Sequence, residues 1–201
     1  LMNLLPSYAL VDGSVNFDGR DLRALAAERK TEKHLWGVEI SMVFQDPMTS
    51  LNPVKKVGEQ IAESVRYHLG QTRTAARRQA GDLLEQVGIP EPGRRLDEYP
   101  HQLSGGLRQR VVIAAALACE PRILIADEPT TALDVTVQAQ IFALIKAQQV
   151  QTGMSVMLIT HDLGVIAENC DQVVVMYAGQ IAETAPVTDL FKNPLHPYTK
   201  G

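Results

Sequence analysis

The chain has 201 residues, of which 45% are hydrophobic, and a formal net charge of −4 at pH 7. This length allows one domain or slightly more, with a sizeable core, and the negative charge supplies no basic field that would attract nucleic acid. No apolar run reaches the roughly 18 residues of a membrane helix, so we expect any membrane association to be made through a partner.

The N-terminal part of the chain predicts a β-hairpin, a helix and a buried strand. Residues 10–22 alternate apolar and polar side chains around a central Asp-Gly pair, which is a typical hairpin turn. Residues 23–35 are rich in charge and predict an exposed helix. Residues 40–44 predict a strand, and Gln45 follows at its end. Taken alone, Gln45 is best explained as an amide in a loop.

Residues 57–88 contain two helical patterns. The apolar residues of the second pattern share one face, with Thr72 as a candidate cap and Gly88 as a candidate end. This apolar face consists of Ala76, Ala80, Leu83, Leu84 and Val87. A proline-rich loop follows over residues 90–100. We therefore predict a helical subdomain over residues 51–112, inserted into an α/β core.

The stretch LSGGLRQRVVIAAALACEPRILIADEPTTALD predicts a loop, a helix, a strand and a second loop. Ser104 is a good N-cap residue for a buried helix over residues 107–119. Residues 123–126 form a short apolar run that is typical of a buried parallel strand. Asp127 and Glu128 follow this strand, at the end where ligands bind in such sheets.

These placements predict a chemistry. The backbone N–H groups of Ser104, Gly105 and Gly106 at a helix start form an anion site suited to phosphate. Asp127 is suited to Mg²⁺, bound directly or through water. Glu128 beside it is placed to orient or deprotonate an attacking water. Phosphate donors, a metal carboxylate and a base carboxylate together describe nucleotide hydrolysis.

The C-terminal part predicts further strands around a single histidine. An amphipathic helix follows Asp134, and a strand over residues 155–159 leads directly to His161. A lone histidine is more often structural, but its place at the end of a buried strand favours a functional role. Residues 171–177 and 180–184 predict two paired strands.

These motifs resemble those of the ATP-binding cassette (ABC) ATPases. LSGGL resembles the signature motif of that family, ILIADE its Walker B strand with the catalytic glutamate, and ALD its D-loop. Gln45 resembles the Q-loop glutamine and His161 the H-loop histidine. The strings FQDPMTSLNP and NPLHPYTKG are similar to importer ATPases for peptides and nickel.

The resemblance implies an α/β fold, a P-loop NTPase-like ABC ATPase core with an inserted helical subdomain. The expected division is a partial core with hairpin and Q-loop (1–50), the helical subdomain ending in the signature motif (51–112), and the core with Walker B, D-loop and H-loop (113–201). A P-loop requires G-x-x-x-x-G-K-[ST], and no lysine here follows a glycine. We therefore expect an N-terminally truncated chain, either a fragment or a shortened gene product, that is inactive alone.

The resemblance also implies cofactors and site residues. ATP and Mg²⁺ are the expected cofactors. The implied catalytic residues are Glu128, His161 and Gln45; the nucleotide-binding residues are Ser104, Gly105, Gly106 and Asp134; the metal-binding residues are Asp127 and Gln45. Leu107 departs from the signature motif and offers no side-chain hydrogen bond, so only the serine and glycine contacts are carried over.

The implied function is ATP hydrolysis that energises an importer of peptides or nickel. The expected partners are a second ABC ATPase subunit, identical or paralogous, transmembrane permease subunits and, indirectly, a solute-binding protein, with no nucleic acid. The expected place is the cytoplasmic face of the inner membrane, held there by the permease. Two alternatives remain open: a soluble ABC ATPase that moves no solute, and a non-catalytic module that only donates a signature loop.

Overall fold

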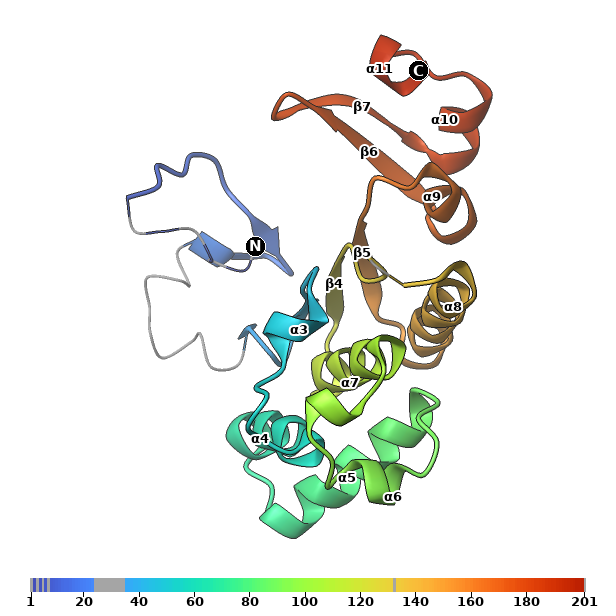
Figure 1. The fold of residues 1–201 in the computed structure, drawn as a ribbon. Helices are drawn as coiled ribbons and strands as arrows, with labels where there is room; N and C mark the ends of the chain where they lie inside the picture. The colour runs from blue at the N-terminus through green and yellow to red at the C-terminus, as the bar shows by residue number, and fades with distance from the viewer. Residues whose placement is uncertain are drawn as a thin grey trace. The chain divides into compact units, whose positions relative to one another are not determined.

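The structure is a computed structural model that describes residues 8–23, 35–131 and 133–200, together with residues 2, 4 and 6 (Figure 1). The chain divides into two compact units, Leu1–Met157 and Leu158–Gly201, and each is described by itself. Most of the helix predicted over residues 23–35 lies outside the described residues. The predicted division into three parts stays a prediction.

Three strands form the sheet of the first unit, in the order β3-β4-β5. They are β3 (Ile40–Val43), β4 (Ile123–Asp127) and β5 (Ser155–Ile159), and β5 continues into the second unit. β3 and β4 are parallel, with Ile40 opposite Ile123 and Val43 opposite Ala126. The predicted buried parallel strand ending in Asp127 is therefore confirmed.

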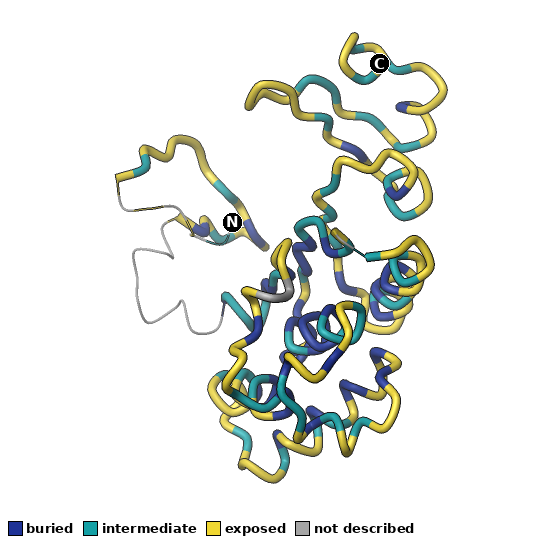
Figure 2. Tube along the Cα trace, viewed as in Figure 1, coloured by how far each residue is buried: buried dark blue, intermediate teal, exposed yellow. Residues whose placement is uncertain are grey.

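Alternate residues of these strands belong to two separate apolar clusters. Ile40 and Ile125 pack with Phe17 in the smaller cluster, which lies on the side of the N-terminal hairpin. Val43 and Leu124 pack in the larger cluster with the apolar faces of the helices. Figure 2 shows the resulting dark-blue band along the strands and the inner helix faces. This two-sided burial explains why β3 and β4 are mostly apolar, with Ser41 and the terminal Asp127 as their polar residues.

The helices of the first unit cover the larger apolar cluster. They are α3 (Pro47–Ser50), α4 (Val57–Leu69), α5 (Arg73–Gln86), α6 (Pro92–Arg95), the 3₁₀ turn η1 (Pro100–Gln102), α7 (Gly105–Leu117) and α8 (Val135–Thr152). Thr72 caps α5 by accepting the backbone N–H of Ala75 at 3.3 Å, and the predicted apolar face of α5 is buried. Among the described residues, no helix combines the length and apolarity that crossing a membrane requires.

The predicted hairpin is present and short. β1 (Asn16–Phe17) pairs antiparallel with β2 (Arg20–Asp21). The turn residues Asp18 and Gly19 both have positive φ, at 54° and 75°. Positive φ at both central residues is the requirement of the tight turn that Asp-Gly favours.

Ion pairs join this hairpin to the starts of β3 and β4. Arg20 makes two bonds to the Glu39 carboxylate, at 3.1 and 2.5 Å, and Arg122 bonds Asp18 at 3.0 Å. Both guanidinium groups lie 5.2 Å from the Phe17 ring centroid. The Arg20 bonds, together with the nearby Arg122 charge, hold the pKa of Glu39 below its ordinary value.

The second unit contains a strand pair and three short helices. β6 (Gln172–Tyr177) pairs antiparallel with β7 (Gln180–Pro186) through a turn at Ala178 and Gly179. This confirms the predicted strand pair, and β7 extends two residues further than predicted. The helices are α9 (Leu163–Asn169), α10 (Val187–Lys192) and α11 (Pro197–Lys200). Glu183 of β7 accepts the backbone N–H groups of Leu195 and His196, at 2.9 and 3.0 Å, which anchors the segment before α11.

Candidate active site

The carboxyl ends of β3 and β4 bring together two residues that are distant in sequence. Val43 lies opposite Ala126 in the parallel register. Gln45 and Glu128 each follow two positions later, just beyond the ends of the two strands. Gln45 Nε2 donates a hydrogen bond to Glu128 Oε2 at 2.7 Å. The register of the sheet therefore places an amide against a carboxylate at the end where ligands bind.

The backbone of Glu128 is unusual, because its φ is +43°. A non-glycine residue in the left-handed region costs free energy and is concentrated at functional sites. Thr131, three residues later, donates its hydroxyl to Glu128 Oε2 at 2.9 Å. Thr131 was not predicted from the sequence, although a hydroxyl residue three positions after the second carboxylate is the available signal.

The signature loop leads into α7, which begins at Gly105, two residues before the predicted start. The helix begins there because Ser104 is its N-cap and accepts the Leu107 N–H at 3.4 Å. Both glycines thus lie in the first turn, where backbone N–H groups have no partner within the helix. Ser104 and Gly105 are exposed and Gly106 is half-buried. This arrangement is suited to an anion such as phosphate.

Asp134 begins the next helix. Its side chain caps α8 by accepting the Val137 N–H at 3.0 Å, so it has a structural role that the motif did not indicate. Its expected contact with nucleotide stays a prediction.

His161 lies in the second unit, in the turn between β5 and α9, and it is exposed to solvent. Asp162 fixes this turn by accepting the N–H groups of Gly164 and Val165, at 2.8 and 3.2 Å. The catalytic role that the resemblance implies for His161 stays a prediction, since the two units are described separately.

The side chains present fit a magnesium ion that also uses phosphate oxygens. Mg²⁺ binds oxygen ligands and usually takes one or two carboxylates together with substrate phosphates and water. Asp127, half-buried at the end of β4, and the amide oxygen of Gln45 supply such atoms. Within the described ranges no group of three His, Cys, Asp or Glu side chains forms a cage of its own. A site completed by nucleotide phosphates is consistent with that finding.

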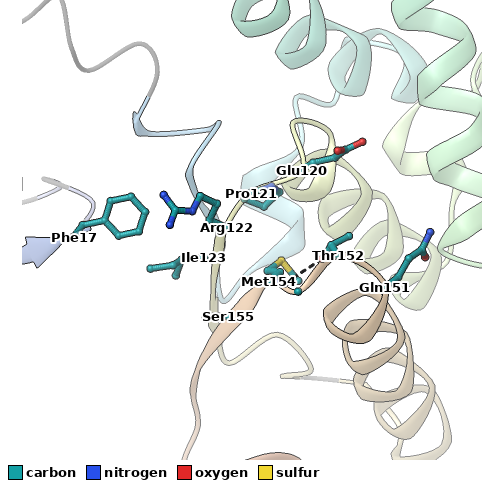
Figure 3. A pocket seen from close by; sticks show the side chains of 10 residues that line it. Phe17, Glu120, Pro121, Arg122, Ile123, Gln151, Thr152, Met154 and Ser155 are labelled. Carbon is teal, nitrogen blue, oxygen red and sulfur yellow. Dashed lines mark hydrogen bonds between the residues drawn. The ribbon is translucent and has the colours of Figure 1, made fainter. Parts of the chain in front are cut away.

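A cavity of about 630 Å³ lies at the opposite end of the strands (Figure 3). Arg122 and Ile123, at the start of β4, line it, as does Ser155, at the start of β5. Phe17 of the hairpin lies beside Arg122 on one side of this cavity. Asp127 and Glu128 lie at the other end of β4, so this cavity is separate from the candidate active site.

Comparisons with known proteins identify the family to which this chain belongs. A family model described as "ABC transporter" matches residues 1–131. The chain belongs to the ABC transporter family. The resemblance stated from the motifs, and the predicted α/β ABC ATPase fold class, are confirmed.

Among characterised relatives, the peptide-import ATP-binding proteins are similar to this ABC chain. The dipeptide transport ATP-binding protein DppD of Bacillus subtilis is 55% identical over 203 residues, which covers 100% of this chain and 60% of that protein. DppD of Escherichia coli is 53% identical over 187 residues, covering 93% of this chain and 57% of that protein. The chain thus spans less than two thirds of the length of these relatives.

Solved ABC cassettes share the fold. The ATP-binding cassette MJ0796, as a dimer in a post-hydrolysis state bound to ADP and Pi, has a TM-score of 0.76 and 28% identity, covering 88% of this chain and 74% of that one. CbiO1 from Clostridium perfringens, part of the transporter complex cbiONQ, has a TM-score of 0.75 and 27% identity, covering 90% of this chain and 69% of that one.

Proposed function

We propose that this chain provides the ATP-hydrolysing machinery of an ABC importer for peptides. The observation that supports this proposal most directly is the 2.7 Å hydrogen bond from Gln45 to Glu128. It joins the ends of two neighbouring parallel strands and holds a carboxylate where ligands bind in such sheets.

Glu128 is the general base of the proposed reaction. Gln45 and Thr131 both donate to its Oε2, which fixes the orientation of the carboxylate. The other oxygen, Oε1, accepts the proton of the attacking water. Fixing the base in advance lowers the entropy that must be lost at the moment of reaction.

The remaining residues hold the nucleotide and its metal. The backbone N–H groups of the loop from Ser104 to Gly106 bind a phosphate, and Asp134 lies near the nucleotide. Asp127 and the Gln45 oxygen hold Mg²⁺, which neutralises charge on the phosphates when it is bound. His161 contacts the terminal phosphate and the attacking water.

A second ATPase subunit, identical or paralogous, completes each site in the proposal, and the dimeric MJ0796 cassette supports this arrangement. Several relatives are named for peptide or dipeptide transport, which supports a peptide, and not nickel, as the transported solute. Permease subunits then hold the protein at the cytoplasmic face of the inner membrane, and a solute-binding protein delivers the solute to them. These names also count against a soluble ABC ATPase that moves no solute.

The test is the substitution Glu128→Gln, made in a transporter assembly in which the ATPase subunit that carries this chain also has a P-loop. ATP binding is expected to persist, while turnover falls by roughly 10² or more, because a carboxamide cannot accept the water's proton. The matched control is Glu85→Gln, which removes a carboxylate from the exposed side of α5. Turnover that is equal in the two variants would remove Glu128 from the mechanism.

The same assembly separates transport from the alternatives. Peptide uptake into vesicles should require both the permease and an active Glu128. Full turnover that never depends on a permease would favour the soluble ATPase. Turnover that is unchanged by Glu128→Gln but lost on disruption of residues 104–106 would favour the signature-donating module.

A further inference from the structure

The N-terminal turns of α7 and α8 approach each other closely at Gly106. A Cβ atom placed on Gly106 would lie 2.9 Å from Val137 Cγ1, whereas carbon atoms in good contact are about 3.5–4.0 Å apart. The neighbouring Gly105 differs, because a Cβ there would lie 3.8 Å from Leu133 Cδ2, an ordinary contact. Of the two signature glycines, only Gly106 lies against a side chain that excludes a methyl group.

The backbone of Gly106 does not require glycine. The residue is helical, and its φ is outside the left-handed region. In a helix, alanine is ordinarily more stable than glycine. The reason for glycine at this position must therefore come from its surroundings, and on this chain those surroundings are Val137.

Val137 is itself held in place. Asp134 accepts its backbone N–H at 3.0 Å, which fixes the first turn of α8, and the Val137 side chain packs against the larger apolar cluster. One turn further along both helices, Arg110 donates to Gln140 Oε1 at 2.8 Å. The same guanidinium donates to the Val87 carbonyl at 2.5 Å, so it also joins the end of α5.

We infer that Val137 is a positioning residue for the signature loop. It occupies the space that a side chain at 106 would need and so sets the position of the loop relative to Asp134 and α8. Any displacement of the N-terminal end of α8, which follows the D-loop, would then also displace the first turn of α7. This inference rests on the proposed function, in which residues 104–106 bind a phosphate, and it assigns the glycine at 106 a second role beyond phosphate approach.

The test is a double-mutant cycle with Gly106→Ala and Val137→Ala in the protein that carries this chain, with its partner ATPase subunit present. Gly106→Ala alone is expected to lower the midpoint of thermal unfolding by about 2–4 °C, because the methyl group meets Val137. Val137→Ala opens the space, so the double variant should unfold at a higher temperature than the two single shifts predict. Turnover lost in Gly106→Ala should be partly recovered in the double variant.

Gly105→Ala with and without Val137→Ala is the matched control. Its added methyl group has room, so the two single shifts in unfolding midpoint should simply add. Additive shifts at position 106 as well, with no recovery of turnover, would overturn the inference and leave phosphate approach as the reason for this glycine. If the parent assembly hydrolyses no ATP, the proposed function fails, while the unfolding cycle still reports on the packing.

Discussion

At the scale of single residues, Glu128 shows how a side chain is fixed by contacts from two directions. Gln45 approaches it from the neighbouring strand and Thr131 from the following turn. Both donors reach the same oxygen, Oε2, so the loss of either leaves the carboxylate freer to rotate. The left-handed φ of Glu128 is stored strain that these contacts must offset.

Thr131→Val is expected to reduce turnover in the complete assembly by about fivefold, which corresponds to about 1 kcal/mol for an exposed hydrogen bond. Valine keeps the shape of threonine and removes the hydroxyl donor. Thr131→Ser retains the donor and should stay close to the parent rate. Steady-state ATPase measurements on the two variants make the comparison, and a loss in Thr131→Ser with none in Thr131→Val would show that the methyl group, not the hydroxyl, matters.

The residues of this site were predictable to different degrees. Asp127 and Glu128 follow an apolar run, and that local pattern was enough to predict a strand end with two carboxylates. Thr131 was missed, because its role comes from a side-chain contact that hydrophobic periodicity does not encode. The same periodicity predicted Val137 on the apolar face of the helix after Asp134, but it did not indicate the close approach to residue 106. Only the packing of α8 against α7 shows why residue 106 is glycine.

At the scale of elements, the ion pairs at the amino ends of β3 and β4 attach the hairpin to the sheet. Glu39 is mostly buried, with its side chain 23% exposed, and it bonds Arg20 at two points. Solvent screens a pair that is this accessible, so its contribution to stability is modest. Within the described residues, strand pairing joins β1 only to β2, so side-chain contacts attach the hairpin to the sheet there.

Glu39→Gln should therefore lower the unfolding midpoint at neutral pH, and the difference from the parent should depend on pH. The pKa of Glu39 is lowered in the folded state, so its contribution is complete above the ordinary glutamate pKa of 4.5. The contribution is lost as the pH falls through the lowered folded pKa. Parent and variant should thus converge under acid conditions in thermal melts across the pH range.

Glu63→Gln is a suitable control for that experiment, because Glu63 pairs with Lys55 at 2.8 Å on an exposed helix face. Glu63→Gln should change the unfolding midpoint less than Glu39→Gln does at neutral pH. A difference for Glu39→Gln that grows on acidification would contradict the lowered pKa.

Patterns of residues close together in the sequence predicted most helices and strands correctly, but they did not predict every helix boundary. The hairpin turn, the capped α5 and the three strands of the sheet follow from residues close in sequence. The start of α7 was misplaced because the two glycines are poor helix formers, yet the Ser104 cap places them in the first turn. The ion pair between Arg122 and Asp18 of the hairpin joins residues that are 104 positions apart in the sequence, which no local pattern reveals.

At the scale of the whole molecule, the proposed importer requires a surface for the permease. Phe44, directly before Gln45, is 43% exposed, and the segment after Gln45 leads to the exposed Ser50. A cysteine at Ser50 can therefore report contact with a partner while Asp127 and Glu128 stay unchanged.

Ser50→Cys in the assembled transporter is expected to form cross-links with permease subunits, and their yield should change with nucleotide. A cysteine at Thr188 of the second unit, exposed at the start of α10, serves as the comparison. Mass analysis of the cross-linked bands identifies the partner. Cross-links from Ser50→Cys to soluble proteins alone would argue against an importer.

The Gln45–Glu128 bond joins residues 83 positions apart, so it also has a consequence for folding kinetics. The helices between them depend on local contacts, whereas the pairing of β3 with β4 must close a long loop first. A shift of β3 by one position in that pairing would turn Ile40 out of its cluster and move Gln45 away from Glu128. Recovery of ATPase activity after denaturation should therefore lag behind recovery of helix content. The return of turnover would then report when β3 and β4 have paired in the correct register.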